Sequence, residues 1–319
     1  KFFMNFDIRK SKGVFAIATT PFNEDGNIDF SSIDKLSDYY ITSQVSGLTI
    51  LGVMGEAPKL NLQEQKLVIE RYIKNIGKQV PVIVGVSNPG LDNLISISND
   101  AMELGASGVM VAGNNGLKND DQIKSYFNQV SISLKNIPIC LQDYPPTTNV
   151  YLSTSVIKDL FSNNENFLMF KHEDCPGHKK LSQLIEFRNL MNTSKFSILV
   201  GNGGIYVPQE LKRGADGIMT GFAFTQMLVE VYNLFYKEDY EKGEDLFDLY
   251  LPLIRHEQQF GVGLAIRKEV LKLIGVITSS KVRAPGPILD KNDFIELDRL
   301  ILRLKNKLEE RKIPIPKGI

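Results

Sequence analysis

The sequence predicts an α/β protein, a (β/α)8 TIM barrel with a C-terminal helical extension, and three observations support this. Short apolar segments alternate eight times with longer segments of helical pattern between residues 14 and 237. The apolar segments do not alternate with polar residues, which is typical of parallel strands covered on both faces. No Gly-rich dinucleotide-binding motif follows the first segment, and this disfavours the competing doubly wound open sheet.

The eight units follow one another without long interruptions. Strands are expected at VFAIATT (14–20), GLTIL (47–51), VPVIVGV (80–86), SGVMVAG (107–113), IPICLQD (137–143), NFLMFK (166–171), FSILVGN (196–202) and ADGIMTG (215–221). Helices are expected near residues 31–43, 61–76, 91–104, 120–135, 153–162, 178–191, 206–212 and 223–237. No strand pattern and no Ser/Gly-rich linker follows, so residues 1–239 are assigned to the barrel and 240–319 to a helical extension packed on its outside.

Composition limits the function classes. The chain has 319 residues, of which 43% are hydrophobic, and 37 basic residues balance 37 acidic ones. This balance gives no electrostatic reason to expect nucleic acid or an anionic membrane as partner. The two cysteines, Cys140 and Cys175, lack metal-site spacing. Together with the absence of a long apolar run and of a signal-peptide pattern, they predict a cytoplasmic protein with reduced thiols.

The ends of the predicted strands contain one lysine. Barrel active sites lie at the C-terminal ends of the strands, and Lys171 ends the sixth strand after the apolar run Phe167 to Phe170. A desolvated ammonium loses charge stabilisation, so its neutral amine becomes accessible and can condense with a ketone. The residues alone leave two other interpretations open: Lys171 reaches solvent, or it pairs with a carboxylate such as Glu173.

Other strand ends are less specific. The Gly-rich stretches GVMGE and GNGG are explained equally by tight turns and by backbone that approaches a carboxylate or phosphate. RGADGIMTG also fits a phosphosugar or flavin barrel. His172 follows Lys171 and is expected to point away from the barrel interior, in a packing or surface role. No group of His, Asp and Glu residues has metal-ligand spacing, so no metal is expected.

Taken together, the strand ends resemble the dihydrodipicolinate synthase/N-acetylneuraminate lyase family. The resemblance covers nearly the whole chain and includes TPF at strand 1, Gly52-x-x-Gly55-Glu56 at strand 2, Pro145 after strand 5, Lys171 at strand 6, Gly201 at strand 7 and VRAPGP at 282–287. It implies a Schiff-base barrel enzyme that acts on 2-oxo acids, with Lys171 as the imine-forming lysine and a homotetramer as the assembly.

Several positions depart from the family's synthases and lyases. A threonine or serine pair is usual where this chain has Val53 and Met54, and a proton-relaying tyrosine where it has Gln142. The synthases also carry an arginine at the position of Thr147 and a tyrosine pair in place of Asn114-Asn115. The motifs GVMGEAPKL, QDYP, KHEDCPG and GNGGIYVPQELKRGADGIMTGFAF are more similar to the family's sugar-acid dehydratases, and most similar to 2-keto-3-deoxy-L-arabonate dehydratases.

The resemblance implies roles for particular residues. Lys171 forms the imine, and Tyr144 or Gln142 moves protons, with Asp143 as a third candidate for that step and for substrate binding. The other expected substrate-binding residues are Gly52, Val53, Met54, Gly55, Glu56, Gly201, Asn202 and Gly203. The substrate is a small 2-keto-3-deoxy sugar acid, and no cofactor is expected because the imine on Lys171 stores the electrons. Two alternatives remain, a retro-aldol lyase that uses the same imine and a non-catalytic 2-oxo-acid binding protein.

Overall fold

The computed structural model describes residues 6–191 and 195–319 and contains a closed barrel of eight parallel strands in sequence order. The strands are β1 (Gly13–Ile17), β2 (Gly47–Ile50), β3 (Val82–Gly85), β4 (Gly108–Ala112), β5 (Ile139–Asp143), β6 (Phe167–His172), β7 (Ser197–Val200) and β8 (Gly217–Thr220). β1 pairs with both β2 and β8, which closes the sheet. The predicted fold class is therefore confirmed, and all eight strands lie within the predicted segments apart from one residue at the start of β1 and one at the end of β6.

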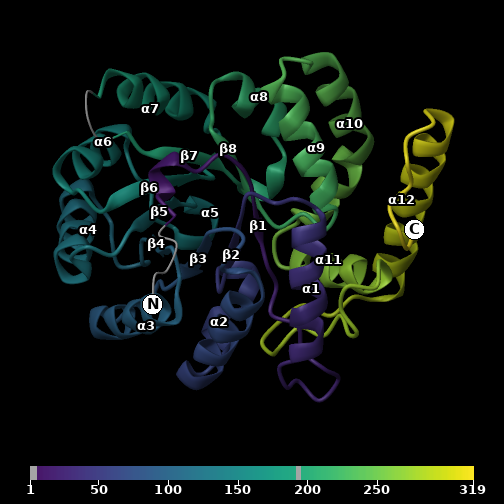
Figure 1. Ribbon diagram of the computed structural model, residues 1–319, viewed down its shortest axis with the longest axis horizontal. Helices are drawn as coiled ribbons and strands as arrows, with labels where there is room; N and C mark the ends of the chain where they lie inside the picture. The colour runs from purple at the N-terminus through teal and green to yellow at the C-terminus, as the bar shows by residue number, and fades with distance from the viewer. Residues whose placement is uncertain (1–5, 192–194) are drawn as a thin grey trace.

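Helices surround the barrel (Figure 1). They are α1 (Phe30–Thr42), α2 (Leu62–Ile76), α3 (Leu91–Leu104), α4 (Asp120–Leu134), α6 (Thr154–Asn163), α7 (His178–Leu190), α8 (Val207–Lys212) and α9 (Thr225–Tyr236). An additional single-turn helix, α5 (Pro145–Thr148), follows β5. Capping explains several starts: Asn61 forms a capping box with Glu64 at α2, and Asn119 accepts from the Gln122 backbone at α4.

Three helices follow the barrel. They are α10 (Tyr240–Glu257), α11 (Gly263–Leu273) and α12 (Lys291–Glu310). Figure 1 shows α12 at the edge of the molecule, away from the strands, and its Leu297, Ile301, Leu304 and Leu308 are buried. α10 contacts α8, α9, α11 and α12, so the extension is joined to the barrel by packing.

The apolar residues of the strands fall into two clusters, one on each face of the sheet. The inner cluster fills the barrel and consists of Ile8, Phe15, Ile17, Ile83, Met110, Cys140, Met169, Leu199 and Met219. The outer cluster joins the strands to the helices and contains Phe167 and Phe170. Burial on both faces explains why the strand segments are apolar without alternation.

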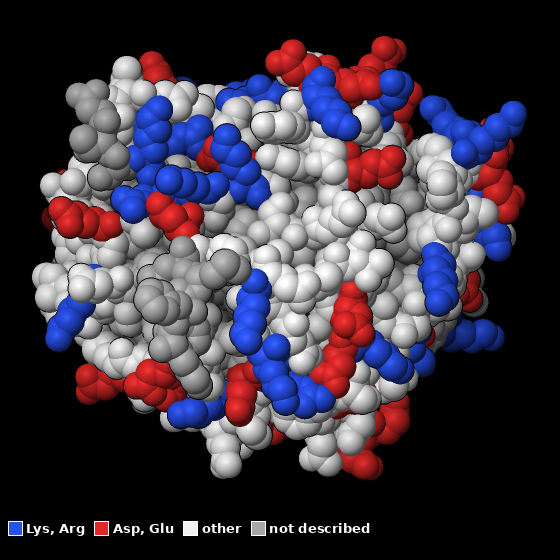
Figure 2. Space-filling view, viewed as in Figure 1, with Lys and Arg blue, Asp and Glu red and all other residues white. Residues whose placement is uncertain are grey.

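The surface carries both signs of charge. Figure 2 shows acidic and basic side chains interspersed over much of the face in view, as the equal counts of 37 basic and 37 acidic residues suggest. Among the described residues, no helix is long and apolar enough to cross a membrane.

Candidate active site

A cavity of about 400 Å³ opens at the C-terminal ends of the strands. Eight of the residues predicted for the site line it: Gly52, Val53, Met54, Glu56, Gln142, Tyr144, Lys171 and Gly203. Four predicted substrate-binding residues, Gly55, Asp143, Gly201 and Asn202, do not line it. Residues 257–261, 263, 264 and 267, from the helical extension, complete the wall.

Lys171 points into this cavity, and its orientation depends on an irregularity in β6. Ile139 pairs with Phe167 and the next residue, Cys140, pairs with Met169, so the register skips Leu168. Phe167 packs outward and Met169 inward, which a regular two-residue alternation would not allow. The extra residue therefore returns Lys171 to the inner face, where only 3% of its surface is exposed.

His172 then points outward and is fully buried, so its predicted packing role is confirmed and the surface alternative is wrong.

Glu173 is the ionisable group that contacts the Lys171 amine. Its Oε2 lies 3.3 Å from Lys171 Nζ and accepts a hydrogen bond of 2.7 Å from Gln142 Nε2. Its Oε1 accepts from the Asn202 backbone N–H at 3.1 Å. A Cβ on Gly201 would lie 2.5 Å from Oε1, so glycine there leaves room for the carboxylate. Lys171 is thus both inside the barrel and paired with Glu173, two interpretations that the sequence had presented as alternatives.

Tyr144 lies on the cavity wall and is linked to α10. Gln258 Nε2 donates to the Tyr144 hydroxyl at 3.3 Å and to Asn202 Oδ1 at 3.0 Å. Burial, reinforced by the Glu173 charge, raises the pKa of the Tyr144 phenol, which therefore keeps its proton at neutral pH. Gly203 allows this arrangement, because a Cβ there would lie 2.0 Å from Gln258 Oε1.

The structure corrects the prediction for Asp143. Gln142 and Asp143 are successive residues of β5, so their side chains point to opposite faces. Asp143 is fully buried outside the barrel, where its Oδ2 accepts from Lys180 Nζ at 2.9 Å. Burial raises the pKa of Asp143 to about 7, although Lys180 acts in the opposite direction. Asp143 therefore does not contact a substrate in the cavity.

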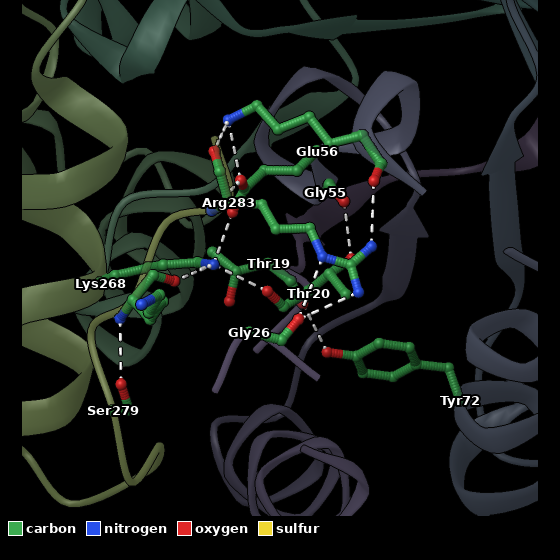
Figure 3. Close-up of polar contacts among 11 residues, drawn as sticks. Thr19, Thr20, Gly26, Gly55, Glu56, Tyr72, Lys268, Ser279 and Arg283 are labelled. Atoms are coloured by element: carbon green, nitrogen blue, oxygen red, sulfur yellow. Dashed lines mark hydrogen bonds and ion pairs between the residues drawn. The ribbon is translucent and has the colours of Figure 1, made fainter. Parts of the chain in front are cut away.

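The loop after β2 is held by a buried ion pair between Glu56 and Lys268 and by further hydrogen bonds to Glu56. Figure 3 shows Glu56, Lys268 and Arg283 converging at this loop. Lys268 Nζ donates to Glu56 Oε1 at 2.5 Å and to the Thr20 carbonyl at 2.8 Å, and the Arg283 backbone N–H donates to Glu56 Oε2 at 3.0 Å. Both carboxylate oxygens are therefore occupied, so Glu56 supports the loop.

The same loop leaves backbone N–H groups as possible donors to a carboxylate. The N–H of Gly55 bonds to the Gly52 carbonyl at 3.0 Å, and that of Glu56 bonds to the Val53 carbonyl at 3.2 Å. Gly55 was predicted to bind substrate, but its N–H is already bonded within the turn and it does not line the cavity. Among the described residues, no backbone partner is found for the N–H groups of Gly52, Val53 and Met54, which line the cavity and are the remaining candidates.

The sequence interpretation missed the contribution of the helical extension. Glu257 and Gln258 at the end of α10, and Arg267 on α11, all line the cavity. The extension was expected to pack outside the barrel, but part of it closes the barrel mouth. The sequence offered one hint of this contribution, namely charged residues within otherwise apolar helical stretches. Surface helices have the same pattern, so the hint did not distinguish a cavity wall from an exposed surface. Among residues 6–191 and 195–319, no three His, Cys, Asp or Glu side chains are grouped as metal ligands.

Comparisons with known proteins agree with this geometry. The model of the dihydrodipicolinate synthetase family matches residues 10–303. An L-2-keto-3-deoxyarabonate dehydratase from Azospirillum brasilense is 26% identical, covering 92% of this chain and 95% of that protein. A putative 2-dehydro-3-deoxy-D-gluconate aldolase from Escherichia coli is 25% identical, covering 92% and 97%. A crystal structure described as dihydrodipicolinate synthase from Rhodopseudomonas palustris is 43% identical with a TM-score of 0.90, covering 92% of this chain and 98% of that one.

Proposed function

Because this chain belongs to the dihydrodipicolinate synthetase family, we propose that it is a Schiff-base-forming dehydratase of a 2-keto-3-deoxy sugar acid. The proposed reaction converts 2-keto-3-deoxy-L-arabonate to 2,5-dioxopentanoate and water. The dehydratase relative from Azospirillum brasilense supports this substrate class. The observation that carries the proposal is the buried Lys171 amine, which lies 3.3 Å from the Glu173 carboxylate inside the cavity.

The chemistry follows from an imine at Lys171. The amine attacks the C2 ketone and water leaves, which gives a protonated imine that accepts electrons. Loss of a C3 proton then forms an enamine, and the enamine expels the C4 hydroxyl as water with a proton from the site. Loss of a C5 proton then gives an enol at C4–C5. Protons return to C3 and C4, the C5 hydroxyl loses its proton, and C5 becomes an aldehyde. Hydrolysis of the imine releases Lys171.

The proposed roles match the positions of the side chains. Glu173 is next to the amine and is held by Gln142, so it is placed to remove the C3 proton. Tyr144 keeps its proton and is placed to protonate the leaving hydroxyl. The N–H groups of Val53 and Met54 are assigned to the C1 carboxylate. This scheme needs no metal or nicotinamide, and a homotetramer is the proposed assembly.

Two other activities use the same imine. The aldolase relative favours retro-aldol cleavage, which breaks the C3–C4 bond and gives pyruvate plus an aldehyde. The Rhodopseudomonas palustris structure is described as a synthase, but here the strand 2 and strand 5 positions that the resemblance assigns to hydroxyl side chains hold Val53, Met54 and Gln142. We therefore prefer dehydration to retro-aldol cleavage and to synthase activity as the proposed reaction.

Borohydride trapping combined with product analysis tests the proposal. With a 2-keto-3-deoxy pentonate, reduction should give a covalent adduct that maps to Lys171, and turnover should give a five-carbon keto-aldehyde. Lys171→Ala should abolish both, and so should Lys171→Arg, because a guanidinium stays protonated and cannot condense. An adduct on another lysine would contradict the mechanism. Pyruvate as product would identify the lyase, and binding without turnover would identify a 2-oxo-acid binding protein.

A further inference from the structure

Gln258 lies where the helical extension meets the barrel, and its side-chain amide contacts two residues at strand ends. It caps the C-terminus of α10, where its backbone N–H donates to the Ile254 carbonyl at 3.1 Å. Its side chain lines the same cavity as Lys171. Nε2 donates to the Tyr144 hydroxyl at 3.3 Å and to Asn202 Oδ1 at 3.0 Å. The two N–H bonds of the amide are therefore used on residues that follow β5 and β7.

The direction of the hydrogen bond to Tyr144 decides where the phenol proton can go. A side-chain amide nitrogen donates and does not accept, so Gln258 Nε2 occupies a lone pair of the phenol oxygen and leaves the phenol proton for another acceptor. Asn202 Oδ1 fixes which end of the amide faces the phenol, because only the nitrogen end can donate to that oxygen. Gly203 leaves room for the other end, since a Cβ there would lie 2.0 Å from Gln258 Oε1. The phenol proton therefore points away from Gln258.

The same hydrogen bond also acts on the acidity of the phenol. Burial raises the pKa of Tyr144 and the Glu173 charge adds to this increase, whereas hydrogen bonding by Gln258 and Thr147 opposes it. A donor to the phenol oxygen stabilises the phenolate that forms when the proton leaves. Gln258 is thus placed both to orient the phenol and to stabilise the anion that the phenol becomes.

We propose that Gln258 is a positioning residue for proton transfer, which holds the Tyr144 phenol so that its proton faces the substrate. This inference rests on the proposed function, in which Tyr144 protonates the leaving hydroxyl. Because Gln258 belongs to the end of α10, the extension orients an acid that the barrel supplies. Loss of the amide should slow the step that uses the phenol proton and leave imine formation on Lys171 unchanged.

A double-mutant cycle between Gln258 and Tyr144 tests this role, with kcat measured as formation of the five-carbon keto-aldehyde from a 2-keto-3-deoxy pentonate. Gln258→Met removes both N–H donors from an unbranched side chain. Alone, it should lower kcat roughly tenfold or more and leave KM and adduct yield within about twofold, because a misplaced catalytic group slows the chemical step. In the Tyr144→Phe background it should change kcat by less than about twofold, since a residue that acts through another has no effect once that one is removed. Gln209→Met, the same exchange at an exposed position on α8, should leave kcat unchanged in both backgrounds.

The outcomes separate this role from the proposed function. An equal fold-loss of kcat in both backgrounds would indicate a structural role for Gln258 and overturn this inference, and so would a normal kcat in either Gln258→Met or Tyr144→Phe. Loss of the adduct in Gln258→Met would overturn it too, because the adduct reports that the variant is folded and forms the imine. All these results leave the proposed function intact as long as wild type forms the adduct on Lys171 and the five-carbon product. Failure of wild type to form any adduct would contradict the proposed function, and this inference with it.

Discussion

At the scale of single residues, the Glu173 carboxylate is the group best placed to exchange a proton near the imine. It contacts Lys171 Nζ at 3.3 Å, and its other oxygen is fixed by the Asn202 backbone. We expect Glu173→Gln to lower kcat by roughly 10²-fold or more, the usual size of a general acid–base contribution, while the borohydride adduct still forms. Glu165→Gln, at an exposed position two residues before β6, is the matched control. Near-normal turnover in Glu173→Gln would remove this residue from proton transfer.

Tyr144 supports a second, independent prediction. Its phenol is held by Gln258 and stays protonated, since burial raises its pKa. Tyr144→Phe should lower kcat by roughly 10²-fold with imine formation retained, because the leaving hydroxyl would lose its acid. Steady-state kcat and the yield of the borohydride adduct are measured for both the variant and wild type. If kcat hardly changes, Gln142, Glu173 or a water must carry that proton.

Glu210 predicts a dependence of stability on pH. Burial raises the pKa of this carboxyl to about 8, from an ordinary 4.5. The folded protein therefore binds a proton that the unfolded chain has lost, so stability falls as pH rises from about 4.5 through 8. Glu210→Gln should have a Tm above that of wild type at pH 9 by at least a few degrees, at about 2–4 °C per kcal/mol, and the gap should shrink toward pH 5. The exposed Glu241→Gln should show no such trend, and a constant gap for Glu210→Gln would contradict the assignment.

The sequence predicted correctly those cavity residues that lie at the end of a strand and point to its inner face. Lys171, Gln142 and Tyr144 line the cavity as expected, since chemistry at a barrel mouth requires polar groups at strand ends. Asp143 is in the same short stretch but on the opposite face, where Lys180 neutralises it. Arg267 could not be assigned, because only the docking of α11 brings it to the cavity.

At the scale of elements, the register shift in β6 decides where the amine points. Counting from the outward Phe167, strict alternation would place Lys171 outside the barrel. The skipped Leu168 reverses that, and the sequence does not mark it, because the apolar residues Phe167 to Phe170 suit either face. The strand was predictable from its composition, whereas its bulge depends on pairing with β5.

The contact of α11 with the β2 loop leads to a stability prediction. Lys268 is fully buried and binds Glu56, the Thr20 carbonyl and the Lys281 carbonyl. Lys268→Met should lower the free energy of unfolding by about 3 kcal/mol, since breaking a buried pair leaves a carboxylate with less compensation. Adding Glu56→Gln should recover part of that loss because it removes the stranded charge. Denaturant titration measures both, and a double variant less stable than Lys268→Met would show that Glu56 acts mainly through other partners.

At the scale of the whole molecule, the barrel followed from the eightfold alternation of segments, and its closure is confirmed. The presence of helices after residue 239 was also predicted, because no strand pattern occurs there. The position of these helices at the cavity was not predicted. An amphipathic pattern shows that one face of a helix is buried but does not show which surface covers that face. α10 and α11 bring Glu257, Gln258 and Arg267 to the wall of the cavity, so the extension is part of the candidate site.

This arrangement predicts different effects for two truncations. A chain ending at Asp239 loses α10 and α11, which exposes the apolar side of α9 and removes Lys268 from the buried Glu56. It should lose near-ultraviolet circular dichroism and form no borohydride adduct. A chain ending at Asp290 lacks only α12 and the tail, which supply no cavity residue, and it should form the adduct on Lys171 despite a lower Tm. The measurements are mass spectrometry of the reduced adduct and thermal unfolding. Adduct formation by the shorter chain at the level of the longer one would show that the barrel alone completes the site, against the role assigned here to α10 and α11.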